Sequence, residues 1–336
     1  MPLRSPNRAL STDPSAKLIR REWRRLTGGK AVRDAGRRTL VACSGGADSV
    51  ALALALASRH IVIAHVVHDL RPAAQAHADR DIARQLAARL GVAFDERAVQ
   101  VPRTGNLEAS ARRARYAALA EMAAAYACPF VAVAHQGDDL IETVLMRLIR
   151  GSAPRGLAAL AETRPLTPAV TLIRPMLRLT RADSERLCAL GGVTSATDAT
   201  NTDTTRLRAN LRRTITPLLR DLAPWLHTRL LSTTSLLRDA ADIADARAGE
   251  ILASAARVGD SIVFARGELR SAPALVIGLS LRQAAGLKRA DRLTSRHLAP
   301  IIRAIQSSST DPKHFSLASA QVEITAHEVA VSARPG

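Results

Sequence analysis

Short strand-like segments that alternate with helical segments constrain the fold of this chain more than any other feature. Three of them are apolar runs, Arg38–Cys43, His60–Val67 and Phe130–Ala134, and Val92–Val101 is a weaker strand signal. The segments between and after them, which have apolar residues at helical spacing, are Asp48–Ser58, Gln75–Leu90, Asn106–Ala127 and Asp138–Arg150. Strands alternating with helices of about 10–20 residues predict βαβ units and a parallel sheet covered on both faces. We therefore expect a doubly wound α/β domain over residues 38–222.

The rest of the chain predicts an N-terminal extension and two further parts. Residues 1–37 are polar and basic, and we expect a disordered extension with one helical stretch. Residues 151–222 look mainly helical. Residues 223–252 predict a helical linker, and residues 253–336 mix short strands with a helix, which predicts a small α+β domain.

The charge balance points to a polyanionic partner. The chain has 48 Lys and Arg residues against 30 Asp and Glu residues, a net charge of +18. Such a field attracts nucleic acid or an anionic membrane surface. Because the basic residues are spread through the folded segments, we favour nucleic acid, although an Arg-rich genome would give a similar balance.

The cysteines and the apolar runs indicate a protein of the reducing cytoplasm. Cys43, Cys128 and Cys188 form no CxxC pair, so a zinc knuckle or iron–sulfur site built from this chain alone is not expected. An odd cysteine count fits a reducing compartment. The sequence has no run of 18 apolar residues, so we expect no membrane segment.

The strongest local motif lies directly after the first strand and before the first helix of the sheet. It consists of Ser44, Gly45, Gly46, Ala47, Asp48 and Ser49. Its glycines let the backbone approach a ligand closely, and successive N–H groups at a helix start bind phosphate oxygens. Asp48 would repel phosphate by itself, so we expect it to hold a bridging Mg²⁺. A plain turn with a helix cap is the alternative interpretation.

An acidic cluster follows the fourth strand. Asp138, Asp139 and Glu142 begin a helix beside His135. Acidic residues in a first helical turn are ordinary compensation of the helix dipole, and a lone histidine is usually structural. At a strand's carboxyl end near a phosphate loop, however, these side chains could bind a metal or a cationic amine.

A basic segment later in the chain is a candidate RNA contact. Arg208 and Arg212 are four residues apart, so a helix would place them on one face. That face is either solvated or bound to RNA phosphates.

The Ser44–Ser49 loop resembles the pyrophosphate loop of the N-type ATP pyrophosphatases. Those enzymes adenylate an oxygen of their substrate, after which a nucleophile displaces AMP. The superfamily includes GMP, NAD and argininosuccinate synthetases and several tRNA-modifying enzymes, and the loop alone does not choose among them.

Further motifs, in their order and spacing, resemble the tRNA(Ile)-lysidine synthases. They are His65–Arg71, Gly105–Ala109, Ala111-Arg112, Arg115-Tyr116, Ala134–Asp139, Glu142–Leu148, Arg174–Leu177 and Asp198–Asn201. The resemblance is strong from Arg38 to Leu219 and weaker in the C-terminal part, where it rests on Leu293–Ile305.

This resemblance implies ATP and Mg²⁺ as cofactors, and free L-lysine and tRNA(Ile) with a CAU anticodon as substrates. The implied reaction is ATP-dependent ligation of lysine to C2 of the wobble cytidine through an adenylated base. It implies catalytic roles for Asp48, His135, Asp138 and Glu142. It also implies that Arg112 and Arg115, with Asp138 and Glu142, bind lysine or phosphate. Contacts of Arg208, Arg212 and the C-terminal domain with tRNA are expected, and a homodimer is left open.

Two other classes of function stay open at this point. One is a different pyrophosphatase-type enzyme, either a tRNA thiolase or a small-molecule amidotransferase. Thiolases usually need cysteine pairs, and an amidotransferase has no need of such a positive charge. The other is a non-catalytic RNA-binding protein with a degenerate nucleotide loop, which would not bind ATP.

Overall fold

The structure is a computed structural model that describes residues 8–58, 60–69, 73–103, 105–158, 160–196, 206–286, 295–317 and 320–333. The motif Asp198–Asn201 and residues Leu70, Arg71 and Leu293 lie outside these ranges. The chain divides into two compact units, one of residues 1–151 and 158–235, the other of residues 152–157 and 236–336.

The first unit is built on a six-stranded sheet in the order β3-β2-β1-β4-β6-β5. Its strands are β1 (Thr39–Ala42), β2 (Ile61–His68), β3 (Ala93–Val99), β4 (Phe130–Ala132), β5 (Thr163–Pro165) and β6 (Thr171–Ile173). All neighbours are parallel except β5, which runs antiparallel to β6 at the sheet's edge. The predicted parallel sheet is confirmed.

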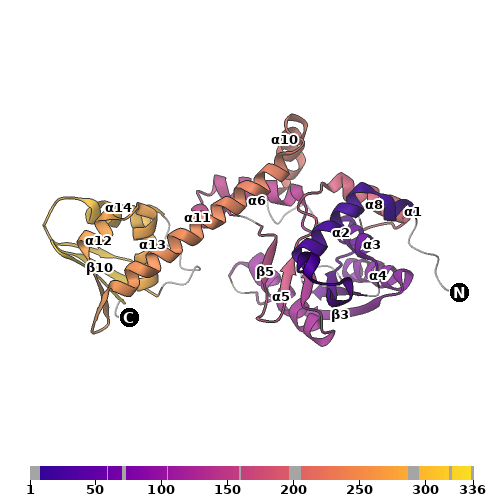
Figure 1. Ribbon diagram of the computed structural model, residues 1–336, viewed down its shortest axis with the longest axis horizontal. Coiled ribbons are helices and arrows are strands. Elements are labelled where there is room, and N and C mark those ends of the chain that lie inside the picture. The colour runs from indigo at the N-terminus through magenta and orange to yellow at the C-terminus, as the bar shows by residue number, and fades with distance from the viewer. Residues whose placement is uncertain are drawn as a thin grey trace. The chain divides into compact units, whose positions relative to one another are not determined.

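Helices cover both faces of this sheet, as the doubly wound prediction requires (Figure 1). On one face lie α3 (Ala47–Leu56), α4 (Ala73–Leu90) and α8 (Arg181–Gly191), which pack against alternate side chains of β1 and β2 such as Val41 and Ile63. On the other face α5 (Leu107–Ala125) packs against Leu40 and Val62. The alternation arises because successive strand side chains point to opposite faces.

The strand order reverses between β1 and β4. From β1 the chain builds outward through β2 and β3, and it then returns to place β4 on the other side of β1. A crevice forms at such a switch point, outside the carboxyl ends of the two strands. The Ser44–Ser49 loop follows β1, and the loop after β4 leads into α6 (Gly137–Ile149), so both motifs flank this crevice.

The N-terminal segment differs from the disordered extension that we expected. Residues 8–26 form α1 (Arg8–Thr12) and α2 (Pro14–Leu26), followed by short turns η1 (Gly29–Ala31) and η2 (Asp34–Gly36). Ile19 and Trp23 of α2 are buried in the core of the first unit, and Trp23 Nε1 donates to Thr39 Oγ1 at 3.0 Å. The few apolar residues of this basic segment are spaced to form one buried helix face.

Residues 151–222 are less helical than predicted. They contain β5 and β6, two three-residue strands that the sequence analysis missed. The helical part comprises the short α7 (Pro154–Leu157), α8, α9 (Arg206–Asn210), the π-helical turn η3 (Leu211–Ile215) and α10 (Thr216–Leu222). Pro217 lacks an N–H and its ring would clash with the carbonyl four residues earlier, so a wider turn ahead of it avoids this clash.

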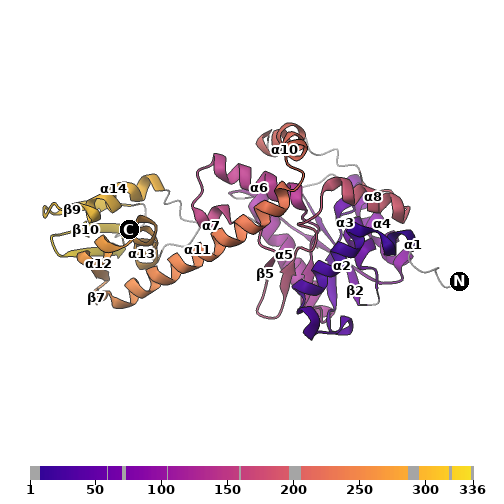
Figure 2. The same cartoon turned by 45° about the horizontal axis from the view of Figure 1, so that its top comes forward.

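The second unit is a small α+β domain. Its antiparallel sheet has the order β7-β8-β11-β10-β9, and α12, α13 and α14 lie beside it (Figure 2). The elements are α7 (Pro154–Leu157), β7 (Ala256–Val258), β8 (Ser261–Ala265), α12 (Arg266–Ser271), α13 (Ala274–Ala284), α14 (Ser295–Gln306), β9 (Lys313–Ser316), β10 (Ala320–Ile324) and β11 (Glu328–Ala333). The predicted linker helix, α11 (Leu226–Ser254), is divided between the two units at residue 235.

A membrane span is not found among the helices that the structure describes, since none combines the required length with sufficient apolar character.

Candidate active site

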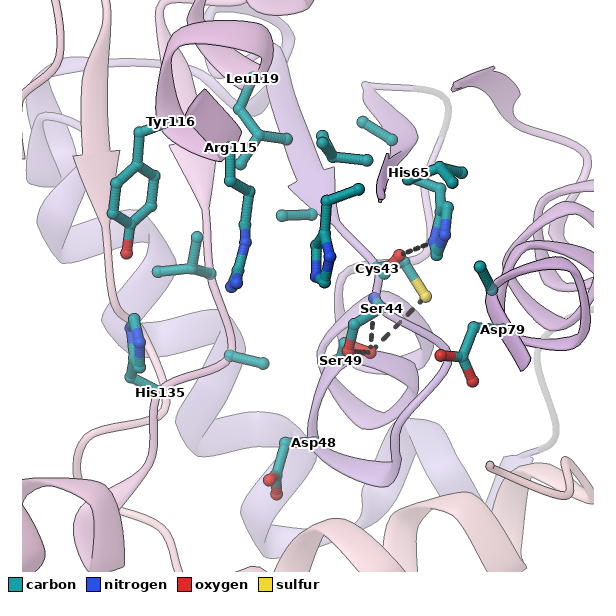
Figure 3. Close-up of a pocket in the computed structure, with 18 residues that line it drawn as sticks. Cys43, Ser44, Asp48, Ser49, His65, Asp79, Arg115, Tyr116, Leu119 and His135 are labelled. Atoms are coloured by element: carbon teal, nitrogen blue, oxygen red, sulfur yellow. Dashed lines mark hydrogen bonds between the residues drawn. The ribbon is translucent and has the colours of Figure 1, made fainter. Parts of the chain in front are cut away.

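A pocket of about 290 Å³ lies at the carboxyl ends of β1, β2 and β4 (Figure 3). Ser44 and Ser49 of the loop after β1 line it, as do Arg115 of α5 and His135 after β4. Its walls include apolar side chains of β2 and α5, such as Val66 and Leu119. Apolar walls with a few convergent polar groups are typical of small-molecule sites, and this volume is near the lower end of their range of ~300–1,000 Å³.

Gly45 is required by the geometry of the phosphate loop. Its φ is +84°, a left-handed conformation that favours glycine. A Cβ at this position would lie 2.8 Å from the backbone oxygen of Asp79 in α4. The loop therefore packs directly on α4, and any side chain at Gly45 would push it away from this position.

The start of α3 presents backbone N–H groups to the pocket. Gly46 is the N-cap residue and supplies no side-chain acceptor for the first turn. The Ser49 hydroxyl instead bridges the loop, accepting from the Ser44 backbone N–H at 3.1 Å and donating to the Gly46 carbonyl at 2.9 Å. This bridge fixes the loop, and the uncapped first-turn N–H groups suit an anionic ligand.

Asp48 fits the role of a metal ligand. Its Oδ1 is buried and has no hydrogen-bond partner among the residues that the structure describes, which is costly for a carboxylate. Burial raises its pKa to about 6, and the negative charge of Asp139 contributes to the rise. A cation would relieve both effects, and Mg²⁺ is commonly held by one or two carboxylates together with substrate phosphates.

His135 is held as a neutral imidazole. Arg174 Nε donates to its Nδ1 at 3.2 Å, which assigns the ring proton to Nε2. Loss of solvent contact lowers the pKa of His135 well below its usual value, and the charges of Arg174 and Arg112 lower it further. His135 can therefore donate one hydrogen bond into the pocket, but it is unsuited to act as a base.

The acidic cluster of α6 is built by a capping box and two arginines. The Asp139 side chain accepts from the Gln136 backbone N–H at 3.1 Å, which caps the helix. Glu142 is fully buried, and its two oxygens accept from Arg208 Nε at 2.9 Å and Arg212 Nε at 2.8 Å. Both arginines also reach Asp139 Oδ1. The buried carboxylate is thereby neutralised, as burial of a charge requires.

Arg208 and Arg212 do share one helix face, as predicted, but this face meets the acidic cluster. Solvent and RNA phosphates were the only partners of these side chains expected from the sequence. Their side chains are about one-third exposed, at 32% and 31%. Their contact with tRNA stays a prediction.

The two carboxylate oxygens of Asp138 differ in their hydrogen bonding. Asp138 Oδ2 accepts from Arg220 Nη1 at 3.1 Å and the Arg181 backbone N–H at 3.3 Å, whereas Oδ1 is buried without a hydrogen-bond partner in the described part of the chain. A second pocket, of about 150 Å³, lies here. Its polar lining includes Asp138, Glu142, Arg181, Glu185, Arg212 and Arg220. A pocket with both carboxylates and guanidiniums suits a small zwitterion.

The two predicted arginines of α5 are placed differently. Arg115 lines the larger pocket, whereas Arg112 is exposed and stacks on the Tyr116 ring, 5.0 Å from its centroid. Sequence reasoning missed Asp79, Arg181 and Arg220. No sequence signal separates those two arginines from the many others of this chain, because their relevance arises only from tertiary contacts with Asp138.

Together these side chains provide the parts of a nucleotidyl-transfer site. One pocket has a helix start with uncapped N–H groups, a buried carboxylate oxygen without a described hydrogen-bond partner, and a neutral histidine. The adjoining pocket has another such carboxylate oxygen among acidic and basic side chains. The loop between β4 and α6 contributes to both, since His135 lines the first and Gln136 and Asp138 line the second.

Comparisons with known proteins agree with this geometry. The PP-loop domain family matches residues 19–219. Among solved structures, a U34-tRNA thiolase from Methanococcus maripaludis has the same fold, with a TM-score of 0.57 at 18% identity over 71% of this chain and 86% of that one.

The chain is also similar to curated tRNA(Ile)-lysidine synthases. That of Geobacter sulfurreducens is 39% identical over 61% of this chain, which spans 45% of that relative's length. That of Salinispora arenicola is 38% identical over 69% of this chain and 70% of its own. That of Thermobifida fusca is 37% identical over 87% of this chain and 90% of its own. A match of this extent establishes the family, and the chain therefore belongs to the ATP-using tRNA(Ile)-lysidine synthases of the PP-loop class.

Proposed function

We propose that this protein ligates lysine to C2 of the wobble cytidine of tRNA(Ile) with a CAU anticodon, with conversion of ATP into AMP and pyrophosphate. The observation that carries the proposal is the pair of adjoining pockets that the β4–α6 loop connects. One suits a nucleotide and the other a small zwitterion, and a two-substrate ligation needs both. The family membership of the chain supports the same reaction.

In the first step, ATP occupies the pocket at the ends of β1, β2 and β4. The uncapped N–H groups at the start of α3 bind the phosphates. Asp48 would hold Mg²⁺, and the ion would supply positive charge that offsets the charge of the departing pyrophosphate. The cytidine O2 attacks the α-phosphorus, and the bond to the β-phosphate oxygen breaks. The base must leave the anticodon stack to reach this position.

In the second step, lysine occupies the smaller pocket. Asp138 Oδ1 accepts a hydrogen bond from one ammonium group, and Arg181 and Arg220 offset the negative charge of the lysine carboxylate. The neutral side-chain amine attacks C2, the C2–O2 bond breaks, and AMP leaves with that oxygen. Holding the amine and the adenylated base next to one another supplies much of the rate acceleration.

Charge placement gives Arg208 and Arg212 a role at this site. Both neutralise Glu142 and Asp139, so they keep the acidic cluster compatible with a nearby polyanion. We propose that their remaining exposed N–H groups contact tRNA phosphates when the anticodon enters. The reaction would take place in the cytoplasm, where tRNA, ATP and free lysine are all present.

A tRNA thiolase is the second candidate, because a solved enzyme of that class shares the fold. The cysteines of this chain do not favour it. Cys43, Cys128 and Cys188 are all buried, and burial raises the pKa of Cys43 and raises that of Cys188 to about 11. Reactive sulfur carriers need accessible thiolates.

The test is lysine incorporation into an unmodified tRNA(Ile) transcript with a CAU anticodon, measured with radiolabelled lysine and ATP·Mg²⁺. Asp48→Ala is the control. Lysine incorporation that is lost in Asp48→Ala supports the proposal. Pyrophosphate release that depends on tRNA without lysine incorporation would keep adenylation and reject lysine as the nucleophile. The absence of any tRNA-dependent turnover would reject the RNA substrate.

A further inference from the structure

A basic hollow of about 1,010 Å³ lies on the surface of the first unit, away from both pockets. It is formed by α2 and the segment that leads from it to β1, at the indigo end of the chain in Figure 2. We call it the α2 hollow. Its charged lining consists of Lys17, Arg20, Arg21, Glu22, Arg24, Arg25, Lys30, Arg33, Asp34, Arg37 and Arg178.

The positive charge of the α2 hollow is largely uncompensated. Its two acids face nine basic side chains. Glu22 is buried, with only 6% of its side chain exposed, and it already pairs with Arg21, Arg25 and Arg178. Lys17, Lys30 and Arg33 are exposed and have no ion pair with any acid that the structure describes. Burial and the neighbouring charge of Arg24 lower the pKa of Arg20, which shows that cations crowd one another here.

The helix α2 arranges its cations in a row. Lys17, Arg20 or Arg21, and Arg24 or Arg25 follow a spacing of three to four residues, so they share one face. Ile19 and Trp23 form the opposite face, which is buried in the core. Because that face is packed in the core, the basic side chains on the opposite face point toward solvent.

The segment after α2 is fixed by a buried arginine. Arg37 is 2% exposed and donates to the carbonyl oxygens of Arg24 at 2.8 Å and Thr27 at 2.9 Å, and also to that of Gly29. Its guanidinium also lies over the Trp23 ring, 5.8 Å from the centroid. The hydrogen bonds of Arg37 thus stabilise the turn, and this turn exposes Lys30 and Arg33 to solvent.

The α2 hollow shares no lining residue with the ATP pocket, and its Arg37 side lies at the opposite end of β1 from the Ser44–Ser49 loop. Arg37 precedes β1 and Ser44 follows it, and four residues of strand span ~13 Å. A ligand in the hollow therefore does not occupy the ATP pocket. A nucleic acid with its reacting base at the carboxyl edge is long enough to pass the other edge as well.

We infer that the α2 hollow binds the phosphate backbone of the RNA substrate at a distance from the modified base. This inference rests on the proposed function for the identity of that RNA. Guanidiniums and ammonium groups in a row suit regularly spaced phosphates, which form most polar contacts in such complexes. An anionic membrane is the weaker candidate, since Val32 is the one aliphatic side chain in the lining and a membrane-binding surface needs a larger apolar face.

The test compares Lys30→Ala/Arg33→Ala with the control Arg84→Ala/Arg97→Ala. The control removes the same charge from the same unit, but its arginines already pair with Glu96 and Glu121. We expect the test variant to raise the Kd and the KM for tRNA roughly tenfold, and to reduce the slope of log Kd against log salt by ~1–2. The kcat and the KM values for ATP and lysine should stay unchanged, and the control should bind tRNA as the unmodified protein does.

Several outcomes separate this inference from the proposed function. If the unmodified protein transfers lysine and the test variant keeps its tRNA affinity and salt slope, the α2 hollow does not bind RNA. An equal loss of tRNA affinity in the control would show that the effect arises from net charge alone, which would overturn the inference. Loss of binding to phosphatidylglycerol vesicles with intact tRNA affinity would assign the surface to membranes. If lysine transfer is absent from the unmodified protein but tRNA affinity still falls in the test variant, the proposed function fails and the inference stands.

Discussion

Asp48 takes up a proton more readily in the folded protein than in the unfolded chain. Its pKa rises from 3.8 to about 6 on folding because burial disfavours the charged carboxylate. A raised folded-state pKa stabilises the protein at low pH, and this stabilisation is lost as the pH rises from about 4 to about 6. At neutral pH the ionised Asp48 thus destabilises the ligand-free protein.

We therefore predict that Asp48→Asn raises the free energy of unfolding at pH 7.5 by ~1–3 kcal/mol while it abolishes turnover. Urea denaturation at pH 4.5 and 7.5 would measure the effect, which should shrink at the lower pH. The affinity of the unmodified protein for ATP·Mg²⁺ should also fall as the pH drops below about 6. An Asp48→Asn protein that is less stable than the unmodified protein at pH 7.5 would contradict the conclusion that the ionised Asp48 carboxylate destabilises the fold.

Substitution of Gly45 tests the close packing of the phosphate loop on α4. Gly45→Ala combines a left-handed φ with a Cβ contact of 2.8 Å to Asp79. We expect ATP affinity to fall at least tenfold, with a stability loss of ~1–3 kcal/mol. Gly91→Ala is the matched control, since its φ is +65° but nothing lies within 4 Å of the added Cβ. It should cost ~1–2 kcal/mol and leave ATP affinity unchanged.

Substitutions of Asp138 and Glu142 should have different effects, the first on lysine binding and the second on stability. We predict that Asp138→Asn raises the KM for lysine at least tenfold and changes ATP affinity little, because its Oδ1 is the unpartnered oxygen of the smaller pocket. Glu142→Gln should instead destabilise the protein by ~3–5 kcal/mol, since it leaves Arg208 and Arg212 without their buried partner. Steady-state kinetics and thermal unfolding of both variants would distinguish these roles. Equal effects on lysine KM would show that neither residue is specific for lysine.

At the residue scale, the motif after β1 was predictable because its function depends on local geometry. The glycines, the helix start and the hydroxyl of Ser49 all lie within six consecutive positions. The partners of Arg208 and Arg212 were not predictable, because Glu142 lies more than 60 residues away in the chain. A one-dimensional pattern shows that two arginines share a face but does not show what that face meets.

At the scale of secondary-structure elements, the packing of α2 into the core was not predicted from the sequence. We predict that Trp23→Ala lowers the free energy of unfolding by ~3–5 kcal/mol, because it removes a buried side chain and its hydrogen bond to Thr39. Arg21→Ala, whose side chain is 72% exposed, is the control and should change stability by less than ~0.5 kcal/mol. Urea unfolding of the full chain would measure both. A Trp23→Ala protein with an unchanged free energy of unfolding would show that α2 does not stabilise the core.

Strands β1, β2 and β4 were predictable because runs of apolar residues mark buried parallel strands. Strand β3 has no buried residue and gave a weaker signal. Strands β5 and β6 have three residues each, and β5 is exposed at all three positions. Such edge strands carry no apolar pattern, and their pairing is decided by the sheet to which they add. The burial of α2 was missed for a related reason, since its apolar face is narrow and lies among arginines.

For the molecule as a whole, the net charge of +18 predicts that RNA binding weakens as the salt concentration rises. Between 50 and 200 mM salt, we predict a slope of log Kd against log salt with a magnitude of ~4–5, as expected for about six neutralised phosphates. Lysine, a small zwitterion, should show less than a twofold change over the same range. Filter binding and calorimetry would provide the two measurements. A salt-independent affinity for tRNA would contradict an electrostatic mode of binding.

The division of the chain into units has a consequence for how this protein can be shortened or recombined. The chain passes between the units three times, because residues 152–157 belong with residues 236–336. Arg155 in this short segment pairs with Asp242 and Asp245 of α11. A stop codon after residue 235 would therefore leave Arg155 of α7 without either of these acids in the remaining fragment. A gene fusion that exchanges the C-terminal unit has to exchange these six residues with it.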